Sequence, residues 1–449
     1  MANHPTNSSF AATDFLKVME NMIPAAQLAA HCAAHAPVPR TPPKLTAPQL
    51  VTGLVYHQLQ PAGTLAAHTA ELHGVKMSDP AHTQRRQGLP VELFEAVMQT
   101  ALRPLADPQR QPECFFGGWR VVGIDGTQWS VTNTPAMVAQ LPKAATRRFR
   151  AAFAKLRLVT AVELGVHHPL AAAAAAASVG EQTLAAKLWA QLPDHSLVIM
   201  DRLFGSPLTL WQALAAWQER PMAFLARVKA NIKVRVVTRL ADGSAIVEVP
   251  VLQQRRKVGV LRVREIRALG VRADGQSFNL RFWTNLLEAA AYPAETLVRH
   301  YVERWEQELY YRELKMDVRG SGVVASYTVE TALQELAALV LATAVVAQMR
   351  VAAAEGLGVA PRRVSFLKVL LATQQLWQTF AWGGPTLTAA QREHIVARYT
   401  EKLRLTALLA PRRARSCPRA VRQPTSAWPR KLNQPSHTGR ASLKIVALP

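Results

Sequence analysis

The chain has 449 residues, 49% of them hydrophobic, and carries a formal net charge of +23 at pH 7. This length suggests roughly two to four domains with buried cores. Its three cysteines are scattered, which argues against a disulfide framework or a zinc site and favours a reducing cytoplasm. The charge attracts polyanions such as nucleic acid, although structural proteins with the same balance exist, so charge alone does not identify a function.

The first hundred or so residues are helical in pattern and rich in Ala, His and Pro. Two apolar segments, TAPQLVTGLVYHQL and TLAAHTAEL, are separated by a Pro-Ala-Gly turn. This rhythm is typical of a helix-turn-helix DNA reader and equally of a small helical bundle, and both interpretations stay open. The N-terminal segment MANHPTNSSFAATD lacks the basic region and apolar core of a signal peptide.

Two aspartates follow apolar runs typical of strands that are covered on both faces. Asp125 follows such a run in WRVVGIDGTQWSV, and Asp201 follows another in HSLVIMDRLFGSP. Each acid is predicted to close its strand and so to be exposed at a sheet edge. A simpler interpretation exists for each, because Asp before Gly is common in turns and Asp caps helices.

A basic segment that includes Arg147 and Lys155 precedes the next strand, LRLVTAVELGV, and either lines a path for DNA or is a solvated loop. His167 and His168 follow that strand. No acid or Cys stands at ligand spacing from them in the sequence, so we predict turn residues rather than a metal site. The pattern after Asp201 predicts a helix over 208–219 and then a strand, MAFLARVK, which together complete a strand, helix, strand unit.

The sequence between Asp201 and Glu308 is far longer than one connection requires. It contains KVRVVTRL, SAIVEVPVL, KVGVLRVREIRAL and SFNLRFWTNL, which alternate like strands and are separated by Asp-Gly turns. We therefore predict a mostly β insertion over 231–285. Trp283 at its end could stack on an unpaired base, but its alternating strand favours a core position.

The segment YVERWEQELYYRELK places Tyr301, Arg304, Glu308 and Lys315 at offsets 0, 3, 7 and 14. At about 100° per residue, the four lie within roughly a 60° arc of one helix. That face offers one acid among three groups suited to binding phosphate oxygens. The alternative is a solvated helix with i,i+4 ion pairs. The other glutamates of the segment are predicted to lie off this face: Glu303, Glu306 and Glu313.

Three carboxylates on two strands and one helix suit Mg²⁺, a hard cation that is shared with substrate phosphates. Further along, the apolar stretch 336–349 is too short to span a membrane and predicts a buried helix that begins near Thr331. The tail from Pro411 is rich in Arg and Lys and has no acid, so we expect it to be disordered when free and to bind phosphates.

The residues 119–370 resemble a DDE transposase of the insertion-sequence-4 family, whose core is ribonuclease-H-like. In that family the third acid lies in a pattern of Tyr, two residues, Arg, three residues, Glu, six residues, Lys, and this sequence matches it at Tyr301, Arg304, Glu308 and Lys315. The resemblance implies that Asp125, Asp201 and Glu308 are catalytic and bind two Mg²⁺ ions, with Mn²⁺ able to substitute. It also implies that Tyr301, Arg304 and Lys315 bind DNA.

The resemblance further implies cut-and-paste transposition of an insertion sequence, by a homodimer that acts on terminal inverted repeats and target DNA in the bacterial cytoplasm and is associated with the nucleoid when bound to DNA. The expected fold is α/β, a ribonuclease-H-like mixed sheet flanked by helices. The expected organisation is a helical DNA-binding region over 1–105, the core over 106–230, the β-rich insertion over 231–285, the catalytic helix and helical part of the core over 286–405, and the basic tail over 406–449.

Two rival functions remain compatible with the sequence. One is a ribonuclease-H-like DNA nuclease without joining activity. The other is an inactive, transposase-derived DNA-binding protein, against which the complete set of three acids argues, because convergent carboxylates repel phosphate.

Overall fold

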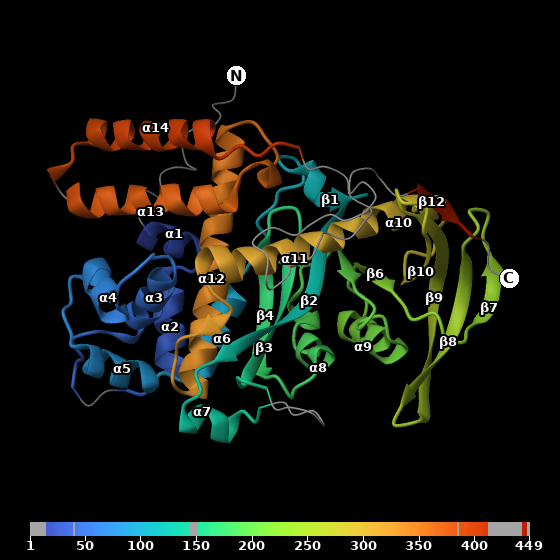
Figure 1. The fold of residues 1–449 in the computed structure, drawn as a ribbon, viewed down its shortest axis with the longest axis horizontal. Coiled ribbons are helices and arrows are strands. Elements are labelled where there is room, and N and C mark those ends of the chain that lie inside the picture. Colours follow the sequence, from blue (N-terminus) through green and yellow to red (C-terminus); the bar gives the residue numbers. More distant parts are fainter. Residues whose placement is uncertain (1–14, 39–40, 144–150, 384–385, 412–441, 447–449) are drawn as a thin grey trace. The chain divides into compact units, whose positions relative to one another are not determined.

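The computed structural model describes residues 15–38, 41–143, 151–383, 386–411 and 442–446 (Figure 1). The chain divides into two units, which are described one at a time. The first joins Met1–Asp194 with Trp305–Leu409, and the second joins His195–Arg304 with Ala410–Pro449. Arg147 of the basic segment and most of the basic tail lie outside the described residues.

The first unit begins with six short helices: α1 (Phe15–Met22), α2 (Ala25–His35), α3 (Ala47–Gln58), α4 (Leu65–His73), α5 (Asp79–Gln87) and α6 (Val91–Ala101). Capping residues and glycines mark where these helices begin and end. Thr46 and Gln49 form a capping box at the start of α3, and Gly74 ends α4 in the left-handed conformation that glycine adopts without strain. The helical pattern of this region is confirmed, and the helix-turn-helix interpretation stays a prediction.

The sheet of the first unit is an antiparallel meander of β2 (Trp119–Val131), β3 (Lys155–Glu163) and β4 (His168–Ala176), flanked by the short helix α7 (Pro135–Gln140). Two short strands, β1 (Phe115–Phe116) and β11 (Val323–Val324), also pair with β2. The alanine run that carried little information in the sequence forms β4. Small side chains suit this position because the strand packs against helices α6 and α12.

Asp125 lies in the middle of β2, where it pairs with Thr160 of β3, so the expectation that it closes its strand was wrong. Gly126 does not make a turn. A Cβ atom at this position would lie 2.5 Å from Glu181 of α8 (Glu181–Ala186), so the glycine permits the close approach of that helix. The strand therefore continues past the Asp-Gly pair.

Helices cover both faces of this meander. A Cβ atom on Gly123 would meet Gln307 of α11 (Trp305–Arg312), whereas one on Gly126 would meet Glu181 of α8. Because side chains alternate along a strand, positions 123 and 126 face opposite sides. Asp125 shares the α11 face with Gly123. The predicted mixed α/β class is confirmed.

The predicted buried helix is α12 (Val329–Gly356), which contacts α3, α6, α13 and β4. It is long and apolar enough to cross a membrane, but 89% of its most apolar window is buried inside the protein, as a core helix would be. The last helices of this unit are α13 (Phe366–Gly383) and α14 (Ala389–Thr406), which pack against each other.

The second unit opens with the predicted strand, helix, strand motif: β5 (Ser196–Met200), α9 (Pro207–Trp217) and the parallel strand β6 (Met222–Arg227). The residues of the expected insertion form β7 (Arg235–Arg239), β8 (Ala245–Gln253), β9 (Arg256–Val271) and β10 (Ser277–Thr284). These four strands are antiparallel and β10 pairs with β6, so they extend the same sheet.

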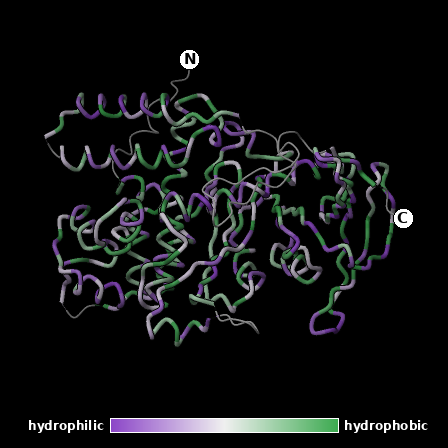
Figure 2. The backbone as a smooth tube through the Cα atoms, viewed as in Figure 1, coloured by the Kyte–Doolittle hydropathy of each residue, from purple (hydrophilic) through white to green (hydrophobic). Residues whose placement is uncertain are grey.

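The turn between β8 and β9 is strongly hydrophilic (Figure 2). Its residues Gln254 and Arg255 both have positive φ, 49° and 66°, which is the conformation of a tight hairpin turn. Within the basic tail, Ser442–Ile445 form β12, which pairs antiparallel with β9. The expected disorder therefore does not extend to these four residues, whose alternating side chains suit an edge strand.

Trp283 is fully buried in β10, so the core interpretation of this residue is confirmed. Its Nε1 donates a hydrogen bond of 2.8 Å to Glu265 Oε2 on β9. The same buried carboxylate accepts from Arg281 Nη2 at 2.6 Å and from Arg267 Nε at 2.8 Å. Donors on β9 itself and on the neighbouring strand β10 thus compensate a charge that would be costly to bury alone.

Trp283→Phe removes one donor from the buried Glu265 carboxylate. We expect it to lower the free energy of unfolding by about 1 to 3 kcal/mol, measured by urea denaturation followed by circular dichroism. Trp382→Phe is the matched control, because that side chain is 89% exposed. Equal midpoints for the two variants would contradict this account of Glu265.

The predicted catalytic helix is not a regular α-helix. Tyr301–Arg304 form the 3₁₀ segment η3, which follows α10 (Ala294–His300), and Glu313–Val318 form a π-helix, η4, after α11. The arc computed at a uniform 100° per residue therefore does not describe this segment, because 3₁₀ and π turns advance by different angles. Short π segments within helices often lie at functional sites.

A buried ionic cluster holds α11 and η4 in place. His167, at φ 53° in the turn before β4, lies between two glutamates: Nδ1 is 2.7 Å from Glu313 Oε2, and Nε2 is 2.9 Å from Glu306 Oε2. Arg350 of α12 lies 3.1 Å from Glu313 Oε1 and also donates to the Val166 carbonyl. Glu306 and Glu313 are thus structural residues, a role that the sequence did not indicate.

We expect Glu313→Gln to lower the free energy of unfolding by about 3 kcal/mol, because it leaves Arg350 and His167 buried beside a neutral amide. Burial would raise the pKa of Glu313, but the charges of His167 and Arg350 outweigh it and hold the pKa below its ordinary value of 4.5. The stabilisation is therefore complete above pH 4.5 and is lost as the pH falls through the lowered pKa. Chemical denaturation from pH 7 to pH 3 measures this change.

The control for this experiment is Glu393→Gln, at an exposed position of α14. Its midpoint should stay near that of the parent at every pH. A stability gap between Glu313→Gln and the parent that stays constant down to pH 3 would show that the carboxylate charge is not the stabilising feature.

Candidate active site

Asp125 and the helix that carries Glu308 meet on one face of the first sheet. Tyr311, one turn after Glu308, donates a hydrogen bond of 2.5 Å to the Asp125 carbonyl and accepts one of 2.9 Å from Thr160 Oγ1. Gln307 Nε2 donates a hydrogen bond of 3.0 Å to Thr160 Oγ1. These contacts join α11 to β2 and β3 at the level of Asp125, and so place the turn that bears Glu308 beside it.

The two carboxylates differ in their surroundings from the neighbouring buried glutamates. Asp125 and Glu308 are both half-buried, and Asp125 Oδ1 accepts a hydrogen bond of 2.8 Å from the Gly126 amide. Burial, followed by the nearby charge of Asp125, raises the pKa of the Tyr311 hydroxyl and keeps it protonated as a hydrogen-bond donor. Tyr311 was not singled out from the sequence, although it lies three residues after Glu308, on the same side of the helix.

Lys315 projects from the π-helix toward β2. Its Nζ donates to the Gln128 carbonyl at 2.8 Å and lies 5.2 Å from the centre of the buried Trp129 ring. Burial, together with the nearby Lys155 ammonium, lowers the pKa of Lys315. Strand β2, which carries Asp125, therefore also orients Lys315, through Gln128 and Trp129.

Asp201 follows directly after β5, as predicted, in the second unit. Its Oδ1 accepts hydrogen bonds from the amides of Leu203 at 2.7 Å and Phe204 at 3.4 Å, which fold the next residues into a tight turn. Gly205 completes the turn against β6, where a Cβ atom would lie 2.0 Å from the Arg227 carbonyl oxygen. The interpretation of Asp201 as a turn residue thus describes part of its role. The close approach of this turn to β6 explains why position 205 is a glycine.

Tyr301 and Arg304 lie in η3, which contacts β5 within the second unit. The Tyr301 ring packs against Phe282 of β10, with ring centres 4.7 Å apart. Each unit therefore contains at least one acid of the predicted triad and at least one residue of the predicted DNA-binding set. Asp125, Glu308 and Lys315 belong to the first unit, and Asp201, Tyr301 and Arg304 belong to the second.

The donor chemistry of the predicted triad fits a divalent cation, because carboxylate oxygens are the hard ligands that Mg²⁺ and Mn²⁺ prefer. Within the part of the chain that the structure describes, no group of three or more His, Cys, Asp and Glu side chains is arranged to hold a metal ion. His167 and His168 do not form such a site: His167 bridges two glutamates, and His168 is buried, which lowers its pKa to about 4.

Comparison with known proteins gives concordant matches. A family model described as "Transposase DDE domain" matches residues 118–345, just over half of the chain, a span that includes Asp125, Asp201 and Glu308. The chain is 26% identical over 316 residues to the transposase InsG for insertion sequence element IS4 of Escherichia coli (strain K12), with 70% of each chain covered.

Among solved structures, the chain is similar to the piggyBac transposase in a synaptic complex with hairpin DNA, with a TM-score of 0.45, 9% identity and coverage of 88% of this chain and 87% of that one. The DDE transposase family generally uses divalent metal ions. By the match of the family model, supported by the InsG relative, the chain belongs to the DDE transposases of the insertion-sequence-4 family.

Proposed function

We propose that this transposase catalyses Mg²⁺-dependent, cut-and-paste transposition of an insertion sequence, with Asp125, Asp201 and Glu308 as the catalytic carboxylates. The observation that supports this most directly is the junction of α11 with β2, where Tyr311 bonds to the Asp125 backbone one turn from Glu308. This junction brings a strand-borne and a helix-borne acid to one sheet face, an arrangement that suits binding of a cation shared with phosphate.

In the proposed reaction, Asp125, Asp201 and Glu308 would hold two Mg²⁺ ions, for which Mn²⁺ can substitute. Bound there, the ions would activate the attacking oxygen and stabilise the leaving oxygen of an in-line displacement. In the cleavage step a water oxygen forms a bond to phosphorus as the bond to the DNA 3′ oxygen breaks. In the joining step that released 3′-hydroxyl attacks a target phosphodiester. Each attacking oxygen loses its proton, and each leaving oxygen gains one.

The three other motif residues are proposed to hold the DNA strand during these steps. Arg304 supplies a planar guanidinium and Lys315 an ammonium, both suited to phosphate oxygens. The Lys315 ammonium donates to the Gln128 carbonyl and lies over the Trp129 ring, and these two contacts restrict its position. Tyr301, packed on Phe282, has a restricted ring from which its hydroxyl can contact the backbone.

The proposed substrates are the terminal inverted repeats of the element and a double-stranded target. We infer a homodimer on DNA, because an element has two ends to be cut and joined. We place the reaction in the bacterial cytoplasm, where the nucleoid supplies the target. The large positive charge supports salt-dependent DNA binding.

Asp125→Asn, Asp201→Asn and Glu308→Gln should each abolish Mg²⁺-dependent cleavage of a labelled duplex that carries the element's own end sequence. Each should leave DNA affinity equal or higher, because a carboxylate near phosphate repels it. Cleavage is read on denaturing gels and affinity by electrophoretic titration. Glu303→Gln is the control on the same segment and should cut within a few-fold of the parent. Normal cutting by any of the three variants would rule out its assigned role.

Arg304→Ala and Lys315→Ala should each slow joining of a pre-cut end to target DNA. Each lost charged contact should raise the activation free energy of joining by about 1.5 to 3 kcal/mol. Lys315→Arg should restore part of the rate, because it keeps the charge. Arg299→Ala, which removes an exposed cation paired with Glu295 on α10, is the control. Parent-like joining by both alanine variants would show that these residues do not contact the DNA. If the parent cuts DNA but does not join it, the protein is a nuclease rather than a transposase.

A further inference from the structure

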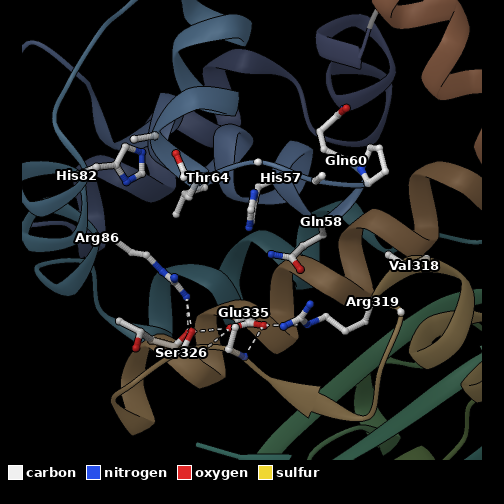
Figure 3. A pocket seen from close by; sticks show the side chains of 18 of the residues that line it. His57, Gln58, Gln60, Thr64, His82, Arg86, Val318, Arg319, Ser326 and Glu335 are labelled. Carbon is white, nitrogen blue, oxygen red and sulfur yellow. Dashed lines mark hydrogen bonds and ion pairs between the residues drawn. The ribbon is translucent and has the colours of Figure 1, made fainter.

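A cavity of about 830 Å³ lies in the first unit, and none of the residues proposed for catalysis lines it (Figure 3). Helices α3 and α5 with the loop after α3 form one wall. The opposite wall comes from residues 317–320, at the end of the π-helix and just after it, and from the start of α12. Figure 3 shows His57, Gln58, Arg86, Arg319 and Glu335 extending toward the same space. The proposed function does not use this cavity.

The acid nearest the centre of this group is already satisfied. Glu335 accepts from the amides of Ala325 at 3.1 Å and Ser326 at 3.0 Å, and from Ser326 Oγ at 2.5 Å. Its Oε1 also lies 3.2 Å from Arg319 Nε. Arg86 is fixed beside it through Nε and Nη2, which bond to Gln334, Ser326 and Thr331. The guanidinium groups of Arg86 and Arg319 are therefore held at the cavity, while the Glu335 carboxylate is occupied by hydrogen bonds within the protein.

The lining carries two further acids, Asp79 and Asp317. Asp79 is exposed to solvent, and its Oδ1 accepts a hydrogen bond of 3.2 Å from Thr64. Burial raises the pKa of Asp317. Burial, together with the charges of Arg86 and Arg319, lowers the pKa of His57 to about 4, so its imidazole is neutral at pH 7. The cavity is thus electropositive at His57.

A chain of hydrogen bonds determines which nitrogen of His57 carries its proton. His68 Nε2 lies 2.9 Å from the Ala62 carbonyl, which can only accept, so this nitrogen carries a proton. In the uncharged imidazole of His68, Nδ1 is then the acceptor for His57 Nδ1, 2.8 Å away. Neutral His57 therefore presents the lone pair of Nε2, which Figure 3 shows on the cavity side.

We propose that this cavity binds a protonated phosphate group, as inorganic hydrogen phosphate or as a terminal phosphate monoester. Its P–OH would donate to His57 Nε2, and its other oxygens would accept from Arg86, Arg319 and the Gln58 amide. The group has two sources in the setting of a DNA-processing enzyme: a small phosphate or nucleotide, or the 5′-phosphate of a DNA end. A phosphodiester has no such proton and fits the lone pair poorly.

The test compares inorganic phosphate with sulfate by isothermal titration of the full-length protein at pH 7.5, where hydrogen phosphate is mostly a dianion. Sulfate has the same shape and charge but carries no proton, so it should bind at least about tenfold more weakly. His57→Asn keeps a donor near the Nδ1 position but removes the Nε2 acceptor, and it should abolish the preference for phosphate. Arg319→Gln should weaken both anions about tenfold. Arg398→Gln, at an exposed position outside the cavity, is the control and should bind as the parent does.

Equal affinity of the parent for phosphate and sulfate would overturn the proposal, as would parent-like binding by both His57→Asn and Arg319→Gln. The Arg319 side chain is 25% exposed, so its variant keeps the test decisive if His57→Asn does not fold. The two sources are separated with duplexes that carry a 5′-phosphate or a 5′-hydroxyl. A preference for the phosphorylated end that Arg319→Gln removes assigns the site to DNA ends, and no preference assigns it to small phosphates.

This proposal does not depend on the catalytic assignment. Loss of cleavage in the carboxylate variants would leave phosphate binding unchanged, and loss of phosphate selectivity in His57→Asn would leave the test of Asp125, Asp201 and Glu308 intact. The two ideas therefore fail separately.

Discussion

The first unit depends on the placement of His167 between Glu306 and Glu313. The helix that carries Glu308 changes from α to π geometry at Glu313, where i→i+5 hydrogen bonds, which are rare in proteins, replace the i→i+4 bonds. Side-chain contacts hold this segment in place: His167, in the turn before β4, contacts both Glu306 and Glu313, and Arg350 of α12 contacts Glu313. A backbone held at positive φ, which is costly for a residue other than glycine, is maintained by these contacts.

The same arrangement explains why one helix can serve both structure and chemistry. Glu306, Gln307, Tyr310 and Tyr311 are buried, whereas Glu308 is half-buried and Arg312 is exposed. On the buried side, the hydrogen bonds of Tyr311 with the Asp125 carbonyl and with Thr160 fix the position of the helix against β2 and β3. Glu308 lies on the more open side. The glycines of β2 make this possible, because a side chain at Gly123 would collide with Gln307 and one at Gly126 would collide with Glu181.

The motif residues are divided between the two units. Asp125, Glu308 and Lys315 belong to one unit, and Asp201, Tyr301 and Arg304 belong to the other. The cavity lies wholly within the first unit, and its wall at 317–320 includes the last two residues of the π-helix that bears Lys315. A ligand there would contact the segment that follows the proposed DNA-binding lysine.

The sequence alone was sufficient to identify the helical N-terminal region, the core helix α12, the strand, helix, strand unit after Asp201 and the β-rich segment, because hydrophobic periodicity and Asp-Gly turns are local signals. It also identified the motif residues, since their spacing is a property of the chain. It misjudged Asp125 as the end of a strand and the catalytic helix as regular, and it did not indicate Tyr311, His167 or the paired glutamates. Those features depend on which distant segments approach: α8 against Gly126, the His167 turn against η4, and α12 against Glu313. Such contacts join residues far apart in the sequence, and only the tertiary structure decides them.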